Sequence, residues 1–132
     1  MDVKTRIEAI YADYANRNIA GVLDAIPDDF CFEWPVDPAH AAYAGVCGTK
    51  AELLAQLQSL AERFTFNRYA ATNIVVDGDR VAAQVALNLT SHQTGDTFDA
   101  TIAHFWTFES GTPVKLVEYM DSALMKHQCG TG

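Results

Sequence analysis

The spacing of apolar residues at the start of the chain predicts two helices. Residues 3–16 carry apolar side chains at intervals of three and four, which places them on one helical face: Val3, Ile7, Ile10, Tyr11 and Tyr14. Asn18 is a typical N-cap for a second, shorter helix over residues 19–26, and Pro27 follows the last residue of that helix. The beginning of the chain is therefore expected to be helical.

A third helix is predicted from Thr49 onwards. Thr49 is a good N-cap, and Glu52 stands at the third helical position, where it completes a capping box. The apolar face of this helix consists of Leu53, Leu54, Leu57, Leu60 and Phe64. Before it, a short apolar strand ends on Trp34, and a loop of small residues follows. An aromatic residue at a strand end beside such a loop is typical of the mouth of a cavity.

The second half of the chain has the pattern of a sheet. Turn sequences centred on Gly78, Gly95 and Gly111 separate segments rich in β-branched and aromatic residues. The predicted strands cover residues 65–76, 80–92, 97–109 and 113–121. Because the connections are short, consecutive strands are expected to be antiparallel neighbours. Helices followed by strands predict an α+β fold, with three N-terminal helices packed on an antiparallel sheet.

Both faces of the strand over residues 97–109 are apolar enough to be covered. One face carries Phe98, Ala100, Ile102, His104, Trp106 and Phe108, and the other carries Asp99, Thr101, Ala103, Phe105 and Thr107. One layer of helices covers only one face of a sheet. We therefore expect a homodimer in which a second subunit covers the face that contains Ile102, His104 and Trp106, which makes His104 an interface or core histidine.

Composition limits the classes of function. The 132 residues fit one domain over residues 1–132, and no apolar run approaches the ~20 residues that span a bilayer. The net charge of −8 repels phosphate backbones, so we expect neither a nucleic-acid partner nor a membrane partner. The charged, amphipathic start of the chain lacks the apolar core of a secretory signal and predicts a cytoplasmic protein.

Metal and cofactor motifs are missing from the sequence. The 3 cysteines have no CxxC spacing, and the 4 histidines include no HExxH pattern. The glycines of the turns stand alone, and the sequence has no glycine-rich loop of the kind that binds phosphate groups. We expect no metal centre and no cofactor.

Three local features together resemble a known family. They are the helix with Tyr11 that leads to NRNIAGVLDAI, the strand and loop FEWPVDP, and the closing strand KLVEYMD. Over nearly its whole length the chain resembles the SnoaL-like and ketosteroid-isomerase-like branch of the nuclear-transport-factor-2-like superfamily. The resemblance implies a curved sheet that closes into a conical barrel around one long helix. It also implies a cavity for a small apolar molecule and dimers formed through the outer face of the sheet.

The acids of the isomerases in this superfamily are absent. Their base directly precedes the proline of a VEDPV-like segment, where this chain has Trp34. Their second acid precedes a His-Phe pair, where this chain has Ala103. The phenol of the first helix matches Tyr11, or Tyr14 if the register slips by one turn. Steroid isomerisation by that mechanism is therefore disfavoured.

A resemblance to another branch of this superfamily, the limonene-epoxide-hydrolase type, indicates Glu118 as a candidate cavity residue. That branch carries an aspartate on the cavity face of its last strand, and LVEYMD places Glu118 there, between Leu116 and Met120. A carboxylate among apolar side chains suits a general acid or base. The branch also uses an arginine and a second aspartate on a neighbouring strand, where Asn88 and Thr90 stand. A glutamate in a structural hydrogen bond is the alternative interpretation.

These residues lead to two hypotheses about function. The first is a cofactor-free isomerase, cyclase, dehydratase or epoxide hydrolase with Glu118 as acid or base and Tyr11 as hydrogen-bond donor. The second is a non-catalytic module for binding a small ligand or for dimerisation. In both, the predicted ligand contacts are Trp34, Tyr14, Tyr43, Asn88, Ala103, Phe105, Leu116 and Met120.

Overall fold

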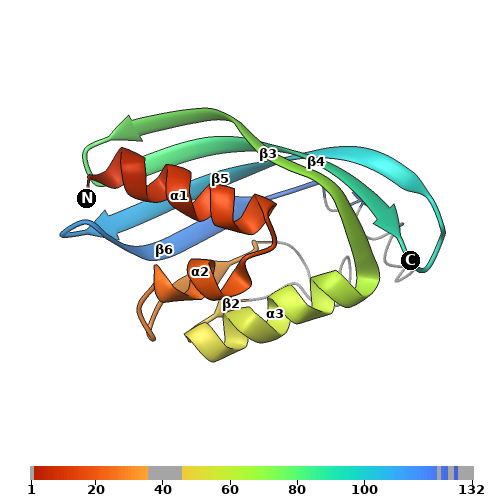
Figure 1. The fold of residues 1–132 in the computed structure, drawn as a ribbon, viewed down its shortest axis with the longest axis horizontal. Coiled ribbons are helices and arrows are strands. Elements are labelled where there is room, and N and C mark those ends of the chain that lie inside the picture. The colour runs from red at the N-terminus through yellow and green to blue at the C-terminus, as the bar shows by residue number, and fades with distance from the viewer. Residues whose placement is uncertain (1, 36–45, 122, 125–126, 128–132) are drawn as a thin grey trace.

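The computed structural model describes residues 2–35, 46–121, 123–124 and 127, and it contains the three predicted helices. They are α1 (Val3–Ala15), α2 (Ile19–Asp24) and α3 (Lys50–Arg63) (Figure 1). The predicted caps are confirmed, because the side chain of Asn18 accepts a hydrogen bond from Gly21 N and that of Thr49 accepts one from Glu52 N. The Glu52 side chain accepts from Gly48 N, one residue before the cap.

The strands form one six-stranded sheet with the order β2-β1-β6-β5-β4-β3. Their bounds are β1 (Cys31–Glu33), β2 (Val46–Cys47), β3 (Phe64–Asp77), β4 (Arg80–Ser91), β5 (Thr97–Glu109) and β6 (Thr112–Tyr119). The four long strands pair antiparallel, as predicted. β1, however, pairs parallel with β6, so the sheet is not wholly antiparallel. This pairing is possible because α3 and β3 to β5 separate the two strands in sequence, and such a long connection brings the chain back in the same direction.

Glycine permits two of the tight turns in this sheet. Gly78 has a φ angle of 58° and Gly95 one of 79°, in the left-handed region that side chains with a Cβ disfavour. Both positions lie in the turns predicted from the sequence. The short turns explain why β3, β4 and β5 follow one another as neighbours.

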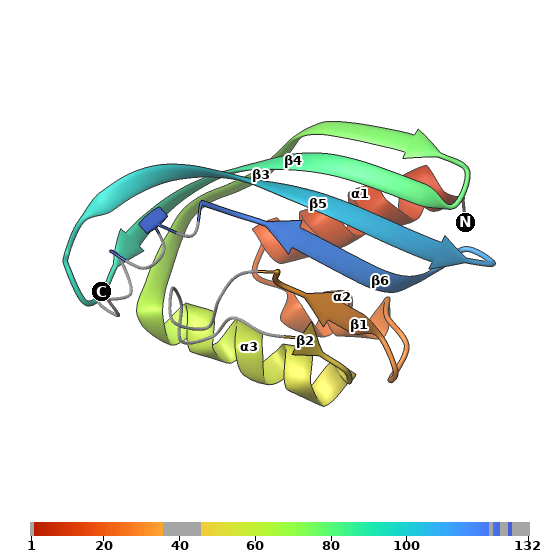
Figure 2. The same cartoon turned by 180° about the vertical axis from the view of Figure 1, so that it is seen from behind.

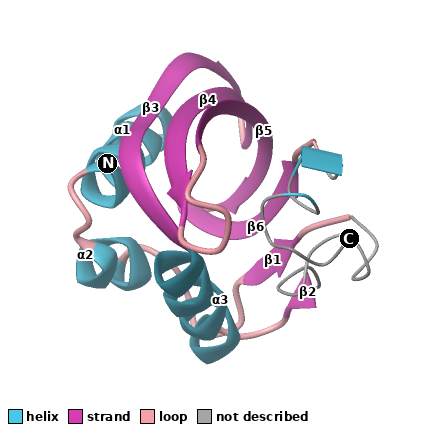
Figure 3. Ribbon diagram, turned by 90° about the vertical axis from the view of Figure 1, so that its right-hand side faces the viewer, coloured by secondary structure: helices cyan, strands magenta, loops and turns pink. Residues whose placement is uncertain are grey.

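The sheet is strongly curved, and the helices lie along its concave side. Figures 1 and 2 show the long strands arching past α1 from opposite sides of the molecule, with α2 and α3 at the open side of the arch. Viewed from the end of the molecule, the long strands curl strongly (Figure 3). The predicted α+β fold with a curved sheet is thus confirmed. No helix within the described ranges is long and apolar enough to cross a membrane.

The concave face of β5 is the one that we expected to meet a second subunit. Ile102, His104 and Trp106 are 8%, 3% and 5% exposed and point into the core, whereas Phe105 is 51% exposed. The prediction that the face with His104 and Trp106 forms a dimer contact is therefore wrong. The curl of the sheet encloses this face together with the helices, so its bulky side chains fill the interior of the same subunit.

Candidate functional site

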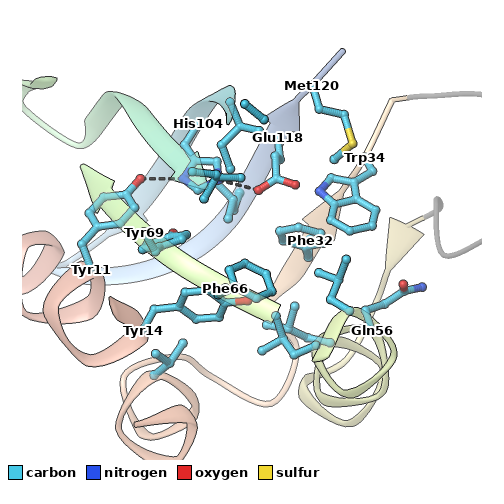
Figure 4. A pocket seen from close by; sticks show the side chains of 18 of the residues that line it. Tyr11, Tyr14, Phe32, Trp34, Gln56, Phe66, Tyr69, His104, Glu118 and Met120 are labelled. Carbon is cyan, nitrogen blue, oxygen red and sulfur yellow. Dashed lines mark hydrogen bonds and ion pairs between the residues drawn. The ribbon is translucent and has the colours of Figure 1, made fainter. Parts of the chain in front are cut away.

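A pocket of about 110 Å³ lies between the concave face of the sheet and the three helices. Most of its wall is apolar and includes residues of α2, α3, β1 and β3 and the residue before β1: Val22, Leu53, Leu57, Phe32, Phe66 and Phe30. Trp34 closes it on the side of β1, where Figure 4 shows the indole facing Glu118. A wall of this kind is typical of pockets for small, mostly apolar molecules.

A chain of buried polar groups crosses one wall of the pocket (Figure 4). The Trp106 indole Nε1 lies 2.9 Å from the Tyr11 hydroxyl oxygen, and this oxygen lies 2.6 Å from His104 Nδ1. His104 Nε2 lies 2.6 Å from Glu118 Oε1. His104 is 3% exposed and Glu118 is 7% exposed, so both are shielded from bulk water. Buried polar groups need such partners, because an unpaired one costs free energy.

The indole of Trp106 is the one donor of fixed direction in this hydrogen-bonded chain. An indole N–H only donates, so the Tyr11 oxygen accepts the hydrogen bond from Trp106. We assign the Tyr11 proton to His104 Nδ1, the arrangement that leaves the imidazole proton on Nε2. That N–H donates to Glu118 Oε1. The chain ends on a carboxylate oxygen.

Within this hydrogen-bonded chain, Glu118 is the group with capacity for a ligand. Both ring nitrogens of His104 are occupied, and the Tyr11 proton is used by His104. Within the described part of the chain, only His104 hydrogen-bonds to the Glu118 carboxylate, through one of its two oxygens. The other oxygen lies on the Trp34 side of the pocket (Figure 4). Tyr11 reaches Glu118 only through His104.

An irregularity in β6 brings His104 and Glu118 to the same face. The pairing of β5 with β6 slips by one residue at Val114, and beyond this point His104 stands opposite Glu118. Without the slip, His104 would stand opposite Val117, and Glu118 would point to the outer face of the sheet. The contact between the imidazole and the carboxylate therefore depends on one extra residue in β6.

A second irregularity, in β3, adds Tyr69 to the pocket. The register of β3 against β4 shifts between Phe66 and Arg68. Phe66 packs on the core before the shift, and Tyr69, opposite Leu87, does so after it. Strict alternation from Phe66 would turn Arg68 inward and Tyr69 outward.

Three phenols lie close together at this end of the pocket. The rings of Tyr14 and Tyr69 are 4.6 Å apart between centroids, and those of Tyr11 and Tyr69 are 6.3 Å apart. Burial raises the pKa of all three hydroxyls, and the negative charge of Glu118 adds to each increase. For Tyr14 the nearby Arg17 guanidinium opposes the rise in pKa. The three phenols therefore stay protonated and act as hydrogen-bond donors over the physiological range.

The structure brings most of the predicted site residues to the pocket. Its lining includes Glu118, Tyr11, Tyr14, Trp34, Leu116 and Met120. Tyr43 lies outside the residues that the structure describes. The lining also includes two residues that sequence reasoning did not assign to it, His104 and Tyr69. His104 alternates with Trp106 on one face of β5, and this pattern was the signal available for His104. For Tyr69, the register shift in β3 breaks the alternation, so the sequence pattern gives no such signal.

Three predicted ligand contacts need correction. Asn88, Ala103 and Phe105 lie on the outer face of the sheet, away from the pocket. Asn88 belongs to a polar ladder there, because its side chain accepts from Asn67 Nδ2 at 3.0 Å and donates to Asp99 Oδ1 at 2.9 Å. Side chains alternate between the two faces along β4 and β5, and the residues next to these three point inward. Asn88, Ala103 and Phe105 therefore point outward.

The described residues contain no group of three His, Cys, Asp or Glu side chains placed to hold a metal ion. The polar groups of the pocket instead hydrogen-bond to one another. A carboxylate among them is a group that can take up and release a proton.

Known proteins resemble this chain in sequence pattern and in fold. The sequence profile described as "SnoaL-like domain" matches residues 7–119. An NTF2-like protein of unknown function from Burkholderia pseudomallei is 20% identical, with 98% of each chain covered and a TM-score of 0.88. A Bacillus subtilis protein provisionally named an isomerase is 14% identical, with 98% of this chain and 94% of the other covered and a TM-score of 0.82. TerC, crystallised with polyporic acid, is 22% identical, with 96% of each chain covered and a TM-score of 0.80.

Because all three sequence identities are low, these structural similarities establish the fold alone. Among curated protein sequences, none matches this chain.

Proposed function

Because the chain belongs to the SnoaL-like domain family, we propose that it is a cofactor-free enzyme that transfers a proton on a small, mostly apolar molecule. The observation that carries this proposal is the Glu118 carboxylate, which lies in the wall of an apolar pocket 2.6 Å from His104 Nε2. The reaction classes that fit are isomerisation, cyclisation, dehydration and epoxide opening. Each of them needs a group that takes a proton at one position and returns it at another.

In the proposed mechanism Glu118 carries the proton. Its free oxygen takes a proton from the ligand, or from a water molecule beside an epoxide, and the resulting carboxylic acid returns the proton later in the cycle. His104 donates to the other oxygen and thereby holds the carboxylate in one orientation. Tyr11 is a positioning residue, because its proton holds His104 in the tautomer that has its N–H directed at Glu118.

The proposed ligand is neutral or weakly cationic. A carboxylate on the pocket wall and a net charge of −8 both oppose the binding of an anion. Two relatives support a small organic ligand and this reaction class: TerC was crystallised with polyporic acid, and the Bacillus subtilis protein is provisionally named an isomerase.

The alternative is a non-catalytic module that binds a small ligand. The observation in its favour is that Trp34 and Ala103 occupy the two positions where the related isomerases carry acids. A screen of small epoxides, enones and hydroxy-ketones separates the two functions when stabilisation against heat and turnover are both measured. Compounds that stabilise the protein and are chemically altered support the enzyme. Compounds that bind and remain unaltered support the binding module and contradict the enzyme.

We propose further that the chain, as a single cytoplasmic domain over residues 1–132, forms a homodimer through the outer face of the sheet. Phe105 and Tyr119 are 51% and 50% exposed on this face. Their rings contact each other with centroids 5.8 Å apart, so they form one apolar surface. A second subunit that covers this surface would remove two large aromatic side chains from water.

A further inference from the structure

The wall of the pocket is rich in aromatic rings. Phe32, Trp34, Phe66 and Tyr69 all line it. The rings of Phe32 and Trp34 meet at an interplanar angle of 65° with centroids 5.3 Å apart, so they form a corner of the wall. The face of an aromatic ring is negative and attracts cations, whereas an aliphatic wall does not. A wall of this composition suits a ligand that has an apolar surface and a positive charge.

The charged side chains that line the pocket are acidic. Glu118 and Asp121 belong to the lining, and within the described part of the chain no lysine or arginine does. Glu118 is 7% exposed, and His104 contacts one of its two oxygens. Among the described residues the second oxygen has no cationic partner, and a carboxylate held away from bulk water without one costs free energy. A cation inside the pocket would reduce this cost.

An arginine already lies against part of this wall from outside. The guanidinium carbon of Arg17, an exposed residue, is 4.9 Å from the ring centre of Tyr14 and 4.6 Å from that of Phe66. Burial raises the pKa of Tyr14, and the charge of Arg17 opposes this increase, so the positive field reaches that side of the pocket. Figure 4 shows Tyr14 and Trp34 on opposite sides of the pocket. A cationic ligand is therefore repelled from the side of Tyr14 and attracted to the side of Trp34 and Glu118.

We propose that the pocket binds a small alkylammonium cation, whose charged centre lies between the Glu118 carboxylate and the rings of Phe32 and Trp34. The inference rests on the proposed function, because it names the class of ligand for the same pocket. Figure 4 shows the carboxylate of Glu118 projecting from β6 toward these two rings. An alkylammonium group matches these surroundings, because the carboxylate compensates its charge and its alkyl surface packs on the rings.

The test compares two probes of the same shape, choline and 3,3-dimethylbutan-1-ol. They differ in one atom, because choline has a quaternary nitrogen where the alcohol has a neutral carbon. Their dissociation constants are measured by chemical-shift titration for the wild type, Glu118→Gln, Trp34→Leu and Glu109→Gln. We expect the wild type to bind choline more tightly than the alcohol.

Each variant removes one part of the proposed interaction. Glu118→Gln should weaken choline binding roughly tenfold to a hundredfold and leave the alcohol unchanged, because only the cation interacts with the charge of the carboxylate. Trp34→Leu should weaken choline roughly threefold to tenfold relative to the alcohol, because leucine keeps an apolar contact without the ring. Glu109→Gln is the matched control, since it removes the same charge at an exposed position of β5 and should leave both constants unchanged.

Three outcomes would overturn the proposal. They are a wild type that binds the alcohol at least as tightly as choline, a ratio of the two constants that Glu118→Gln or Trp34→Leu leaves unchanged, and equal effects of Glu118→Gln and Glu109→Gln. Thermal unfolding of each variant shows that the fold is intact before the constants are compared.

The proposed function is tested separately, by the turnover of neutral compounds. A protein that prefers choline through Glu118 and alters none of these compounds would refute the enzyme and leave the cation site standing. A protein that converts a neutral compound and prefers the alcohol over choline would refute the cation site and leave the enzyme standing.

Discussion

His104 and Glu118 stand directly opposite each other on β5 and β6, with His104 Nε2 2.6 Å from Glu118 Oε1. Because the other imidazole nitrogen accepts the proton of Tyr11, the histidine orients the carboxylate and has no free nitrogen for a ligand. The carboxylate has a second oxygen. In the proposed function Glu118 therefore has the reactive role, and His104, Tyr11 and Trp106 have the positioning role.

Removal of the Tyr11 hydroxyl should destabilise the protein. Tyr11→Phe leaves the indole N–H of Trp106 and the Nδ1 of His104 without their partner in a buried site, which costs about 1–3 kcal/mol. Urea unfolding measures the change in the free energy of unfolding. The control is Tyr119→Phe, whose ring is 50% exposed on the outer face and whose effect should stay within about 0.5 kcal/mol. Equal effects of the two substitutions would show that the hydrogen-bonded chain is not stabilising.

Stability should fall at alkaline pH. Burial raises the pKa of Tyr11, Tyr14 and Tyr69, so above the ordinary tyrosine value of about 10 the unfolded chain loses protons that the folded chain keeps. The free energy of unfolding then decreases by about 1.4 kcal/mol per pH unit for each such tyrosine, while the stability below about pH 10 is unaffected by these groups.

Urea unfolding from about pH 8 to about pH 11 measures this dependence. Tyr69→Phe should give a shallower decrease than the wild type, because one of the three groups no longer titrates in the unfolded state. Lysines titrate in the same range, and the comparison of the two proteins cancels their contribution. Identical slopes would mean that the Tyr69 phenol titrates normally in the folded protein.

A charge on the outer face should prevent dimerisation. Phe105→Asp places a carboxylate at the centre of the proposed contact, where its desolvation opposes association. Sedimentation velocity at micromolar concentration should show a dimer for the wild type and a monomer for Phe105→Asp. Glu8→Lys, on the exposed side of α1, changes the net charge away from the sheet and should leave the dimer intact. A monomeric wild type, or a dimeric Phe105→Asp, contradicts the proposed interface.

The protein should not isomerise ketosteroids. Trp34 and Ala103 replace the two acids that this chemistry uses in the related isomerases. An absorbance assay for the conjugated product should give the uncatalysed rate. Steroid turnover that persists in Glu118→Gln would show that another residue in the pocket acts as the base.

Local signals in the sequence were sufficient for the elements of this fold. Asn18 and Thr49 cap helices through their own side chains, and Gly78 and Gly95 adopt backbone angles that glycine favours. Each of these features depends on a few adjacent residues, so the sequence alone determines it. The parallel pairing of β1 with β6 depends on contacts between distant segments, and local signals did not reveal it.

The composition of the site depends on two register shifts that local patterns do not encode. The shift in β3 turns Tyr69 inward, and the slip at Val114 places Glu118 opposite His104. Strict alternation from Phe66 predicts the outer face for Tyr69. The sequence identified Glu118 through the family resemblance and its alternation with Leu116 and Met120, whereas the inward face of Tyr69 and the pairing of His104 with Glu118 required the three-dimensional register of the strands.

The most direct test of the account is the turnover of Glu118→Gln on any compound from the screen that the wild type converts. Glutamine keeps an oxygen that accepts from His104, so the variant should fold and bind the compound as the wild type does. It cannot carry the proton, and turnover should fall roughly 10²–10⁴-fold. Glu109→Gln, at an exposed position of β5, is the matched control and should retain full activity. Turnover by Glu118→Gln at the wild-type rate would contradict the central claim that this carboxylate performs the reaction.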